Sequence, residues 1–203
     1  MIRSRFLLIL AAMLLTLLVA KGAHAGQPTE QLKPAIDRVI KTLEDPALKG
    51  EAKTKERRQA LHTIGDEVFD WTEMARRALG RHWQGRTEAE RDEFVKLFRD
   101  LIERSYMSTV ERHSGEKITY AGDSVDGDQA ILRTKFTTKK GQEVPIDYRM
   151  IRRGDRWLVY DVAVENVGLV NNYRTQFNQV IQTSSYRELV KKMKNQEFIR
   201  KPS

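Results

Sequence analysis

The hydrophobic pattern of this 203-residue chain changes its period near Gly115, and this change limits the possible folds. Before Gly115, apolar residues recur every three or four positions, as they do along one face of a helix. After it, they alternate with polar residues, as in half-buried strands, and glycine-containing turns favour antiparallel neighbours. The expected strands are Lys117–Ala121, Gln129–Thr137, Glu143–Arg152 and Arg156–Glu165.

Local signals set the ends of the expected helices. Thr29 is the expected cap of the first helix, and Asp70, Thr87 and Ser185 each stand three positions before a glutamate, which is the spacing of a capping pair. Gly80 ends the helix that Asp70 begins, and the chain closes with two more helices. The predicted fold class is α+β: a four-stranded antiparallel twisted sheet with helices packed on one face, enclosing an apolar cavity.

The N-terminus has the features of a secretory signal peptide. Arg3 and Arg5 precede the apolar run Phe6–Ala20, which is too short to span a bilayer comfortably, and Ala23-His24-Ala25 offers a cleavage site. The chain contains no cysteine, so it has neither a lipid attachment site nor disulfides. We therefore expect residues 1–25 to be removed and residues 26–203 to form a single domain that diffuses freely outside the cytoplasm.

The chain has a formal net charge of +8 at pH 7. Export argues against nucleic acid as a partner, so a positive charge favours anionic lipid headgroups or acidic proteins. Two arginine clusters could meet phosphate or form a solvated face, and the sequence leaves both interpretations open. These clusters are Arg76, Arg77 and Arg81, and Arg149, Arg152, Arg153 and Arg156.

Motifs that would indicate an enzyme or a metal centre are missing from the sequence. There is no nucleophile elbow, zinc-binding helix motif or glycine-rich phosphate loop. Asp66 stands four residues after His62, which is only a weak metal signal. Asp161 lies among apolar neighbours in a strand, where a carboxylate needs partners. We interpret Asp161 as a structural carboxylate bonded to a backbone end or to an arginine such as Arg174, and we predict no enzymatic activity and no metal.

The segment Trp157–Ile181 combines an apolar strand with an apolar helix face and carries little reactive chemistry, which suggests carriage of an apolar ligand. Core packing alone would also explain these faces. The predicted lipid-binding residues share apolar faces of the long helix, the sheet and the flanking helices. They are Trp71, Ala75, Leu79, Phe94, Phe98, Leu101, Ile102, Tyr106, Ile146, Tyr148, Leu158, Tyr160, Val162, Val167, Leu169 and Tyr173.

Two blocks of the sequence carry a recognisable pattern. The first block comprises Phe69-Asp70, Met74-Ala75-Arg76, Ala78-Leu79-Gly80 and Trp83, followed by Phe94, Phe98 and Tyr106. The second comprises Val159-Tyr160-Asp161-Val162, Glu165, Val167, Leu169-Val170, Asn172-Tyr173-Arg174 and Gln176-Phe177. Together the two blocks resemble the MlaC family, also called toluene-tolerance auxiliary transport proteins. Where that family usually has E-G-V-S, this chain has Glu165-Asn166-Val167-Gly168.

The resemblance implies a periplasmic phospholipid shuttle. Such a protein carries glycerophospholipid between an outer-membrane lipoprotein complex and an inner-membrane ABC transporter complex, and it contacts membrane surfaces transiently. The phospholipid is cargo, with acyl chains in an apolar pocket, and no other cofactor is implied. Two alternatives remain from the residues alone: a small cone-shaped α+β enzyme with Asp161 as general base, and a periplasmic adaptor that binds no lipid.

Overall fold

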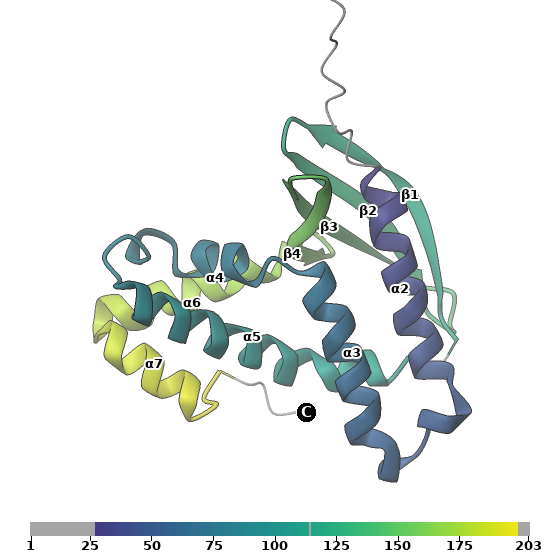
Figure 1. The fold of residues 1–203 in the computed structure, drawn as a ribbon, viewed down its shortest axis with the longest axis horizontal. Helices are drawn as coiled ribbons and strands as arrows, with labels where there is room; N and C mark the ends of the chain where they lie inside the picture. Colours follow the sequence, from purple (N-terminus) through teal and green to yellow (C-terminus); the bar gives the residue numbers. More distant parts are fainter. Residues whose placement is uncertain (1–26, 114, 199–203) are drawn as a thin grey trace, which may run out of the picture.

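The computed structural model describes residues 27–113 and 115–198, and Figure 1 shows how their helices and strands are arranged. The predicted signal peptide, residues 1–25, lies outside these described residues. Among the helices that the structure describes, none is long and apolar enough to cross a membrane.

The first helix, α2, spans Pro28–Glu44 and begins earlier than the sequence suggested. Its cap is Gln27, which forms a capping box with Glu30, and proline at the first helical position favours this start. Thr29 lies inside the helix, where its hydroxyl donates a 2.6 Å hydrogen bond to the Asp123 carboxylate of the sheet. The predicted Thr29 cap is therefore wrong, because a tertiary contact uses that side chain.

Three other predicted caps are confirmed. Asp70 and Ser185 each accept a hydrogen bond from the backbone N–H three residues later, and Thr87 forms a complete capping box with Glu90. These caps satisfy N–H groups that the first turn of a helix leaves unpaired. The remaining helices are η1 Pro46–Leu48, η2 Glu51–Lys53, α3 Thr54–Val68, α4 Trp71–Leu79, η3 Gly80–His82, α5 Glu88–Glu111, α6 Leu169–Thr183 and α7 Tyr186–Lys194.

The sheet is antiparallel and has five strands in the order β1-β2-β3-β4-β5, so the prediction of four strands is wrong. Glu165 and Asn166 have φ angles of 50° and 67°, and this two-residue turn folds the chain back onto β4 as the short strand β5. The strands are β1 Lys117–Asp126, β2 Gln129–Thr137, β3 Glu143–Arg153, β4 Arg156–Val164 and β5 Val167–Gly168.

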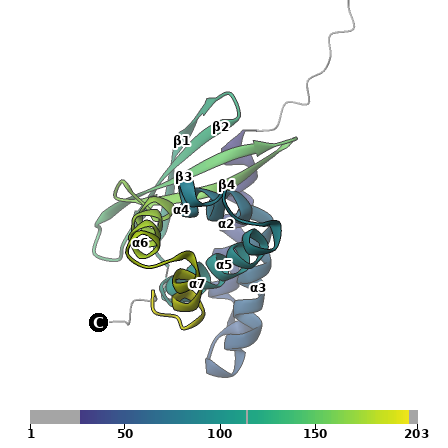
Figure 2. The ribbon, with the colours of Figure 1, turned by 90° about the vertical axis from the view of Figure 1, so that its left-hand side faces the viewer.

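The sequence suggested that all helices pack on one face of the sheet, and this prediction is wrong. Helix α2 lies along the face that carries Leu132 and Met150, whereas α6 begins beside Arg149 on the opposite face. Figures 1 and 2 show α4, α5, α6 and α7 as a separate group beside the sheet. A parallel bridge between Phe69 and Val159 joins the start of α4 to β4.

The buried apolar side chains form two clusters. In the first, Phe94, Phe98 and Phe177 are fully buried with their ring centroids 5.7–6.1 Å apart, which is the range of favourable aromatic contacts. This helical cluster comprises Met74, Ala75, Ala78, Leu79, Trp83, Phe94, Phe98, Leu101, Ile102, Tyr160, Val170, Tyr173, Phe177, Leu189 and Met193. The sheet cluster comprises Leu32, Ala130, Leu132, Met150, Trp157 and Val159.

Candidate functional site

Strand β4 contains a β-bulge at Tyr160, which divides its side chains between the two clusters. Arg149 pairs with Asp161 and Met150 pairs with Val159, so Tyr160 has no partner of its own on β3. Tyr160 packs into the helical cluster, whereas Val159 packs into the sheet cluster. Because a bulge shifts the alternation of side chains by one residue, residues before and after it exchange faces.

One face of the sheet carries apolar side chains that are only partly covered. Ile146 pairs with Val164 across β3 and β4, and Tyr148 pairs with Val162, so these four side chains point to one face. Phe136 points to the same face, because it stands two residues after Thr134, the β2 partner of Ile146. We call these five residues the apolar face. Val164 is 44% exposed, and burial of the phenol group raises the pKa of Tyr148 to about 12. This face is therefore apolar at its surface and poorly hydrated around its tyrosine.

Helix α5 ends beside the apolar face. The ring of His113, just beyond the helix, lies 6.5 Å from the ring of Phe136. Within the last two turns of α5, which ends at Glu111, Val110 and Tyr106 remain 39% and 38% exposed. Large exposed apolar side chains that gather in one region indicate an interaction site.

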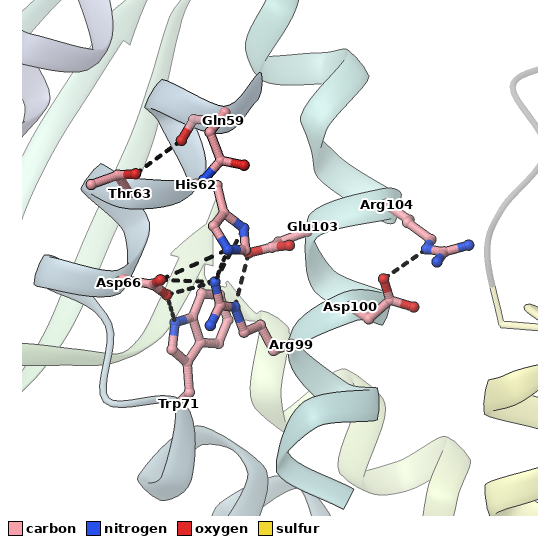
Figure 3. A network of polar contacts seen from close by, with 9 residues as sticks. All are labelled: Gln59, His62, Thr63, Asp66, Trp71, Arg99, Asp100, Glu103 and Arg104. Carbon is pink, nitrogen blue, oxygen red and sulfur yellow. Dashed lines mark hydrogen bonds and ion pairs between the residues drawn. The ribbon is translucent and has the colours of Figure 1, made fainter. Parts of the chain in front are cut away.

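Helices α3 and α5 are joined by a polar network beside Trp71 (Figure 3). Arg99 Nη2 lies 2.8 Å from Asp66 Oδ1, and Arg99 Nε lies 3.1 Å from Glu103 Oε1. His62 Nδ1 lies 2.8 Å from the same Glu103 oxygen, and Trp71 Nε1 donates to Asp66 Oδ1 at 3.2 Å. Arg99 also contacts the His62 ring. Arg99 thus occupies the space between these carboxylates. Among the described residues, no group of three or more histidine, cysteine, aspartate or glutamate side chains could hold a metal ion.

The predicted lipid-binding residues fall into three groups in the structure. Tyr148 and Val162 pack against the sheet cluster and, with Ile146, belong to the apolar face, whereas Leu158 precedes the bulge and lies partly buried on the opposite face. Tyr106 and Val167 are exposed. The others belong to the helical cluster or pack against it: Trp71, Ala75, Leu79, Phe94, Phe98, Leu101, Ile102, Tyr160, Leu169 and Tyr173.

Sequence reasoning left Phe136, Val110 and Val164 out of the candidate site. Each carried a usable signal. Phe136 continues the alternation of its strand, Val110 follows Tyr106 by four residues on the same helix, and Val164 follows Val162 by two. All three stand near the ends of their elements, where pattern is weakest.

A pocket of about 720 Å³ lies on the other side of the sheet, where residues of strands β1 to β4 meet α4 and α6. Four arginines line it: Arg76 and Arg77 from α4, Arg149 from β3 and Arg174 from α6. A smaller pocket of about 400 Å³ lies beside α2 and includes Arg38. Both pockets open to solvent, so the enclosed apolar cavity stays a prediction.

Glu73 orders two of the arginines of the larger pocket. Its carboxylate is 5% exposed and accepts hydrogen bonds from Arg76 Nη2 at 2.6 Å and from Arg77 Nε at 2.7 Å. The hydrogen bond from Arg76, supported by that from Arg77, outweighs desolvation and lowers the pKa of Glu73 to about 2. The guanidinium of Arg77 also stacks 3.8 Å over the ring of Tyr160.

Asp161 is a buried carboxylate with two structural partners. Its Oδ2 lies 2.8 Å from Arg149 Nη1, and its Oδ1 accepts the backbone N–H of Val170 at 2.9 Å. The expectation of a backbone end or an arginine is confirmed, but the arginine is Arg149 rather than Arg174. Both carboxylate oxygens are engaged, which favours a structural role over that of a general base.

Comparisons with known proteins agree with this architecture. The chain is 22% identical over 200 residues to the intermembrane phospholipid transport system binding protein MlaC of Haemophilus influenzae, a match that covers 94% of this chain and 92% of that protein. The fold is similar to that of a phospholipid-binding protein from Ralstonia solanacearum, solved in complex with a phospholipid, with a TM-score of 0.75 at 22% identity. That match covers 84% of this chain and 97% of the other.

The family model described as MlaC protein matches residues 33–195, which is most of the chain and includes α3 to α7, all five strands and the apolar face. The predicted family is thus confirmed: this chain belongs to the MlaC family.

Proposed function

We propose that this protein is a phospholipid carrier whose cargo lies with its acyl chains between α5 and the apolar face. One observation carries the proposal. Tyr106 and Val110 on α5 and Val164 on β4 remain exposed, whereas Phe94, Phe98 and Leu101 of α5 and Val159 and Tyr160 of β4 are buried. The contact between His113 and Phe136 supports a position of α5 next to the same face. Acyl chains would cover exposed apolar surface on both sides.

The size of the hydrophobic term supports a carrier. Transfer of one CH₂ group from water gains about 0.8 kcal/mol, so two chains of about 16 carbons gain on the order of 25 kcal/mol in total. A protein must offer comparable burial to accept such a lipid from a membrane. This requires an apolar site and no reactive group, and the headgroup can remain in water. We therefore propose a binding protein without enzymatic activity, in which phospholipid is cargo.

The proposed setting follows from family membership and from the sequence. The relative in Haemophilus influenzae is named for an intermembrane phospholipid transport system. We infer that residues 26–203 form a single lipid-binding domain in the periplasm after removal of the signal peptide. There it would exchange glycerophospholipid with an inner-membrane ABC transporter complex and an outer-membrane lipoprotein complex, with transient contact to membrane surfaces.

Lipid uptake by the delipidated protein tests this function. The protein is incubated with phospholipid vesicles, separated from them and analysed for bound lipid by mass spectrometry. Tyr106→Asp places a charge against the acyl chains and is expected to reduce uptake by about tenfold, because burial of an unpaired charge is costly. Ser108→Asp adds the same charge at an exposed position on α5 and should leave uptake unchanged. Failure of the unmodified protein to take up phospholipid would reject the function.

A further inference from the structure

The arginine-lined pocket is separate from the proposed acyl-chain site. Arg149 alternates with Tyr148 along β3, so the two side chains point to opposite faces of the sheet. Tyr148 belongs to the apolar face, whereas Arg149 lines the pocket together with arginines of α4 and α6. The pocket therefore requires an explanation other than the acyl chains.

Two carboxylates fix the pocket arginines without using all of their donors. Glu73 receives one hydrogen bond from Arg77, through Nε, and Asp161 receives one from Arg149, through Nη1. A guanidinium has five N–H donors in a rigid fork, so other donors of Arg77 and Arg149 remain available. Stacking on Tyr160 further restricts Arg77. The pocket thus holds oriented N–H groups, which lowers the entropy cost of binding an anion.

Arg174 adds a charge that the described part of the chain does not neutralise: no ion pair to it is found there, although Asp126 also lines the pocket. Its side chain lies against Gly80, where an added Cβ would stand 2.9 Å from Arg174 Nε. Gly80 also has a φ of +58°, so glycine meets two requirements at the C-terminal end of α4. The backbone of α4 therefore leaves room for the guanidinium of Arg174 beside those of Arg76 and Arg77.

We propose that this pocket binds a phosphate group, with Arg77, Arg149 and Arg174 as donors. Guanidinium forks match phosphate oxygens well, and three forks from three elements can surround a tetrahedral anion. The phosphate belongs either to a free anion or to the headgroup of an anionic lipid at a membrane surface. In both cases the pocket is a second site, on the face of the sheet opposite the acyl chains.

The direct test is a titration of the delipidated protein with inorganic phosphate, in which the NMR signals of the arginine Nε–H groups report binding. Arg174→Gln is expected to weaken phosphate binding about tenfold, as the loss of a charge-assisted hydrogen bond predicts. Arg187→Gln is the matched control, because Arg187 is an exposed arginine on α7 outside the pocket. Its phosphate affinity should equal that of the unmodified protein. Absence of binding to the unmodified protein, or equal affinity of Arg174→Gln, would overturn the proposal.

Vesicles of phosphatidylglycerol identify the source of the phosphate. If the pocket holds a lipid headgroup, Arg174→Gln reduces vesicle binding and phosphate binding together. If it holds a free anion, phosphate binding falls and vesicle binding is unchanged. Each of these two results supports the site, and lipid uptake into the acyl-chain site is measured separately. If Arg174→Gln loses lipid uptake but keeps its phosphate affinity, the result contradicts a separate phosphate site.

Discussion

Arg149 and Asp161 lie opposite each other on β3 and β4, with Arg149 Nη1 2.8 Å from Asp161 Oδ2. The second oxygen of Asp161 accepts the N–H of Val170 in the first turn of α6. The Asp161 side chain is 4% exposed. One buried side chain thus connects two strands to the helix that carries Tyr173 and Phe177 into the helical cluster.

Replacement of Asp161 should therefore destabilise the fold. Asp161→Ala leaves the Arg149 charge and the Val170 N–H without a partner, and we expect the free energy of unfolding to fall by about 3 kcal/mol. Urea denaturation measures this change. Asp100→Ala removes an exposed ion pair with Arg104 and should cost less than about 1 kcal/mol. Equal losses in the two variants would contradict the anchoring role of Asp161.

Gly168 is expected to tolerate no side chain. A Cβ at this position would stand 2.7 Å from Asp161 Oδ2 and 3.1 Å from Arg149 Nη1. Gly168→Ala should therefore lower the free energy of unfolding by about 1–3 kcal/mol through overpacking. At Gly85, an added Cβ meets nothing within 4 Å, so Gly85→Ala provides the matched control and should change stability by less than about 1 kcal/mol. An unchanged free energy of unfolding in Gly168→Ala would show that there is no clash.

The ion pairs of Glu73 predict a stability loss in acid. Its pKa is about 2 in the folded protein and 4.5 as an ordinary glutamate, so the unfolded state binds a proton first. The stabilisation is complete above about pH 5 and is lost as the pH falls toward 2. We expect this contribution to the free energy of unfolding to be about 2 kcal/mol, because solvent screens the charge of Arg76, which is half exposed. Urea unfolding between pH 6 and pH 3 should show a shallower decline for Glu73→Gln than for the unmodified protein. Parallel curves would refute the prediction.

Arg99 should matter more to stability than its neighbour Arg104 (Figure 3). Arg99 bonds to Asp66 on α3 and to Glu103 on α5, whereas the partner of Arg104 among the described residues is Asp100, within α5. Networks of charges stabilise more than isolated surface pairs. Arg99→Gln is expected to lower the free energy of unfolding by about 1–2 kcal/mol, and Arg104→Gln by less than about 0.5 kcal/mol. Thermal denaturation of both variants measures these changes. Equal losses in the two variants would show that the contacts of Arg99 between α3 and α5 add no stability.

Much of the fold is predictable from sequence where the cause is local. The caps at Asp70, Thr87 and Ser185 each join a side chain to the backbone N–H three residues later, and the strand alternation depends on the pleat. The Thr29 cap failed because Asp123, distant in the sequence, bonds to that hydroxyl. The fifth strand was missed because the turn at Glu165 places two residues other than glycine at positive φ.

The candidate site was harder to predict than the fold. The helical face from Phe94 to Tyr106 was visible as a helical period, yet only packing reveals that Phe94 is buried and Tyr106 exposed. The bulge at Tyr160 has no clear sequence signal, and it moves Leu158 to the face opposite Tyr148. The arginines near Arg77 and Arg149 were noticed as clusters, but only the fold brings them to one pocket with Arg174.

The most direct test of the account locates the acyl chains in the loaded protein. The delipidated protein is loaded with a phospholipid that carries a diazirine in one acyl chain, irradiated, digested and analysed by peptide mass spectrometry. If the acyl chains lie between α5 and the apolar face, crosslinks form on α5 near Tyr106 and Val110 and on the strands near Ile146 and Tyr148. Crosslinks confined to the arginine-lined pocket near Arg174, or no crosslinks at all, would contradict this placement of the acyl chains.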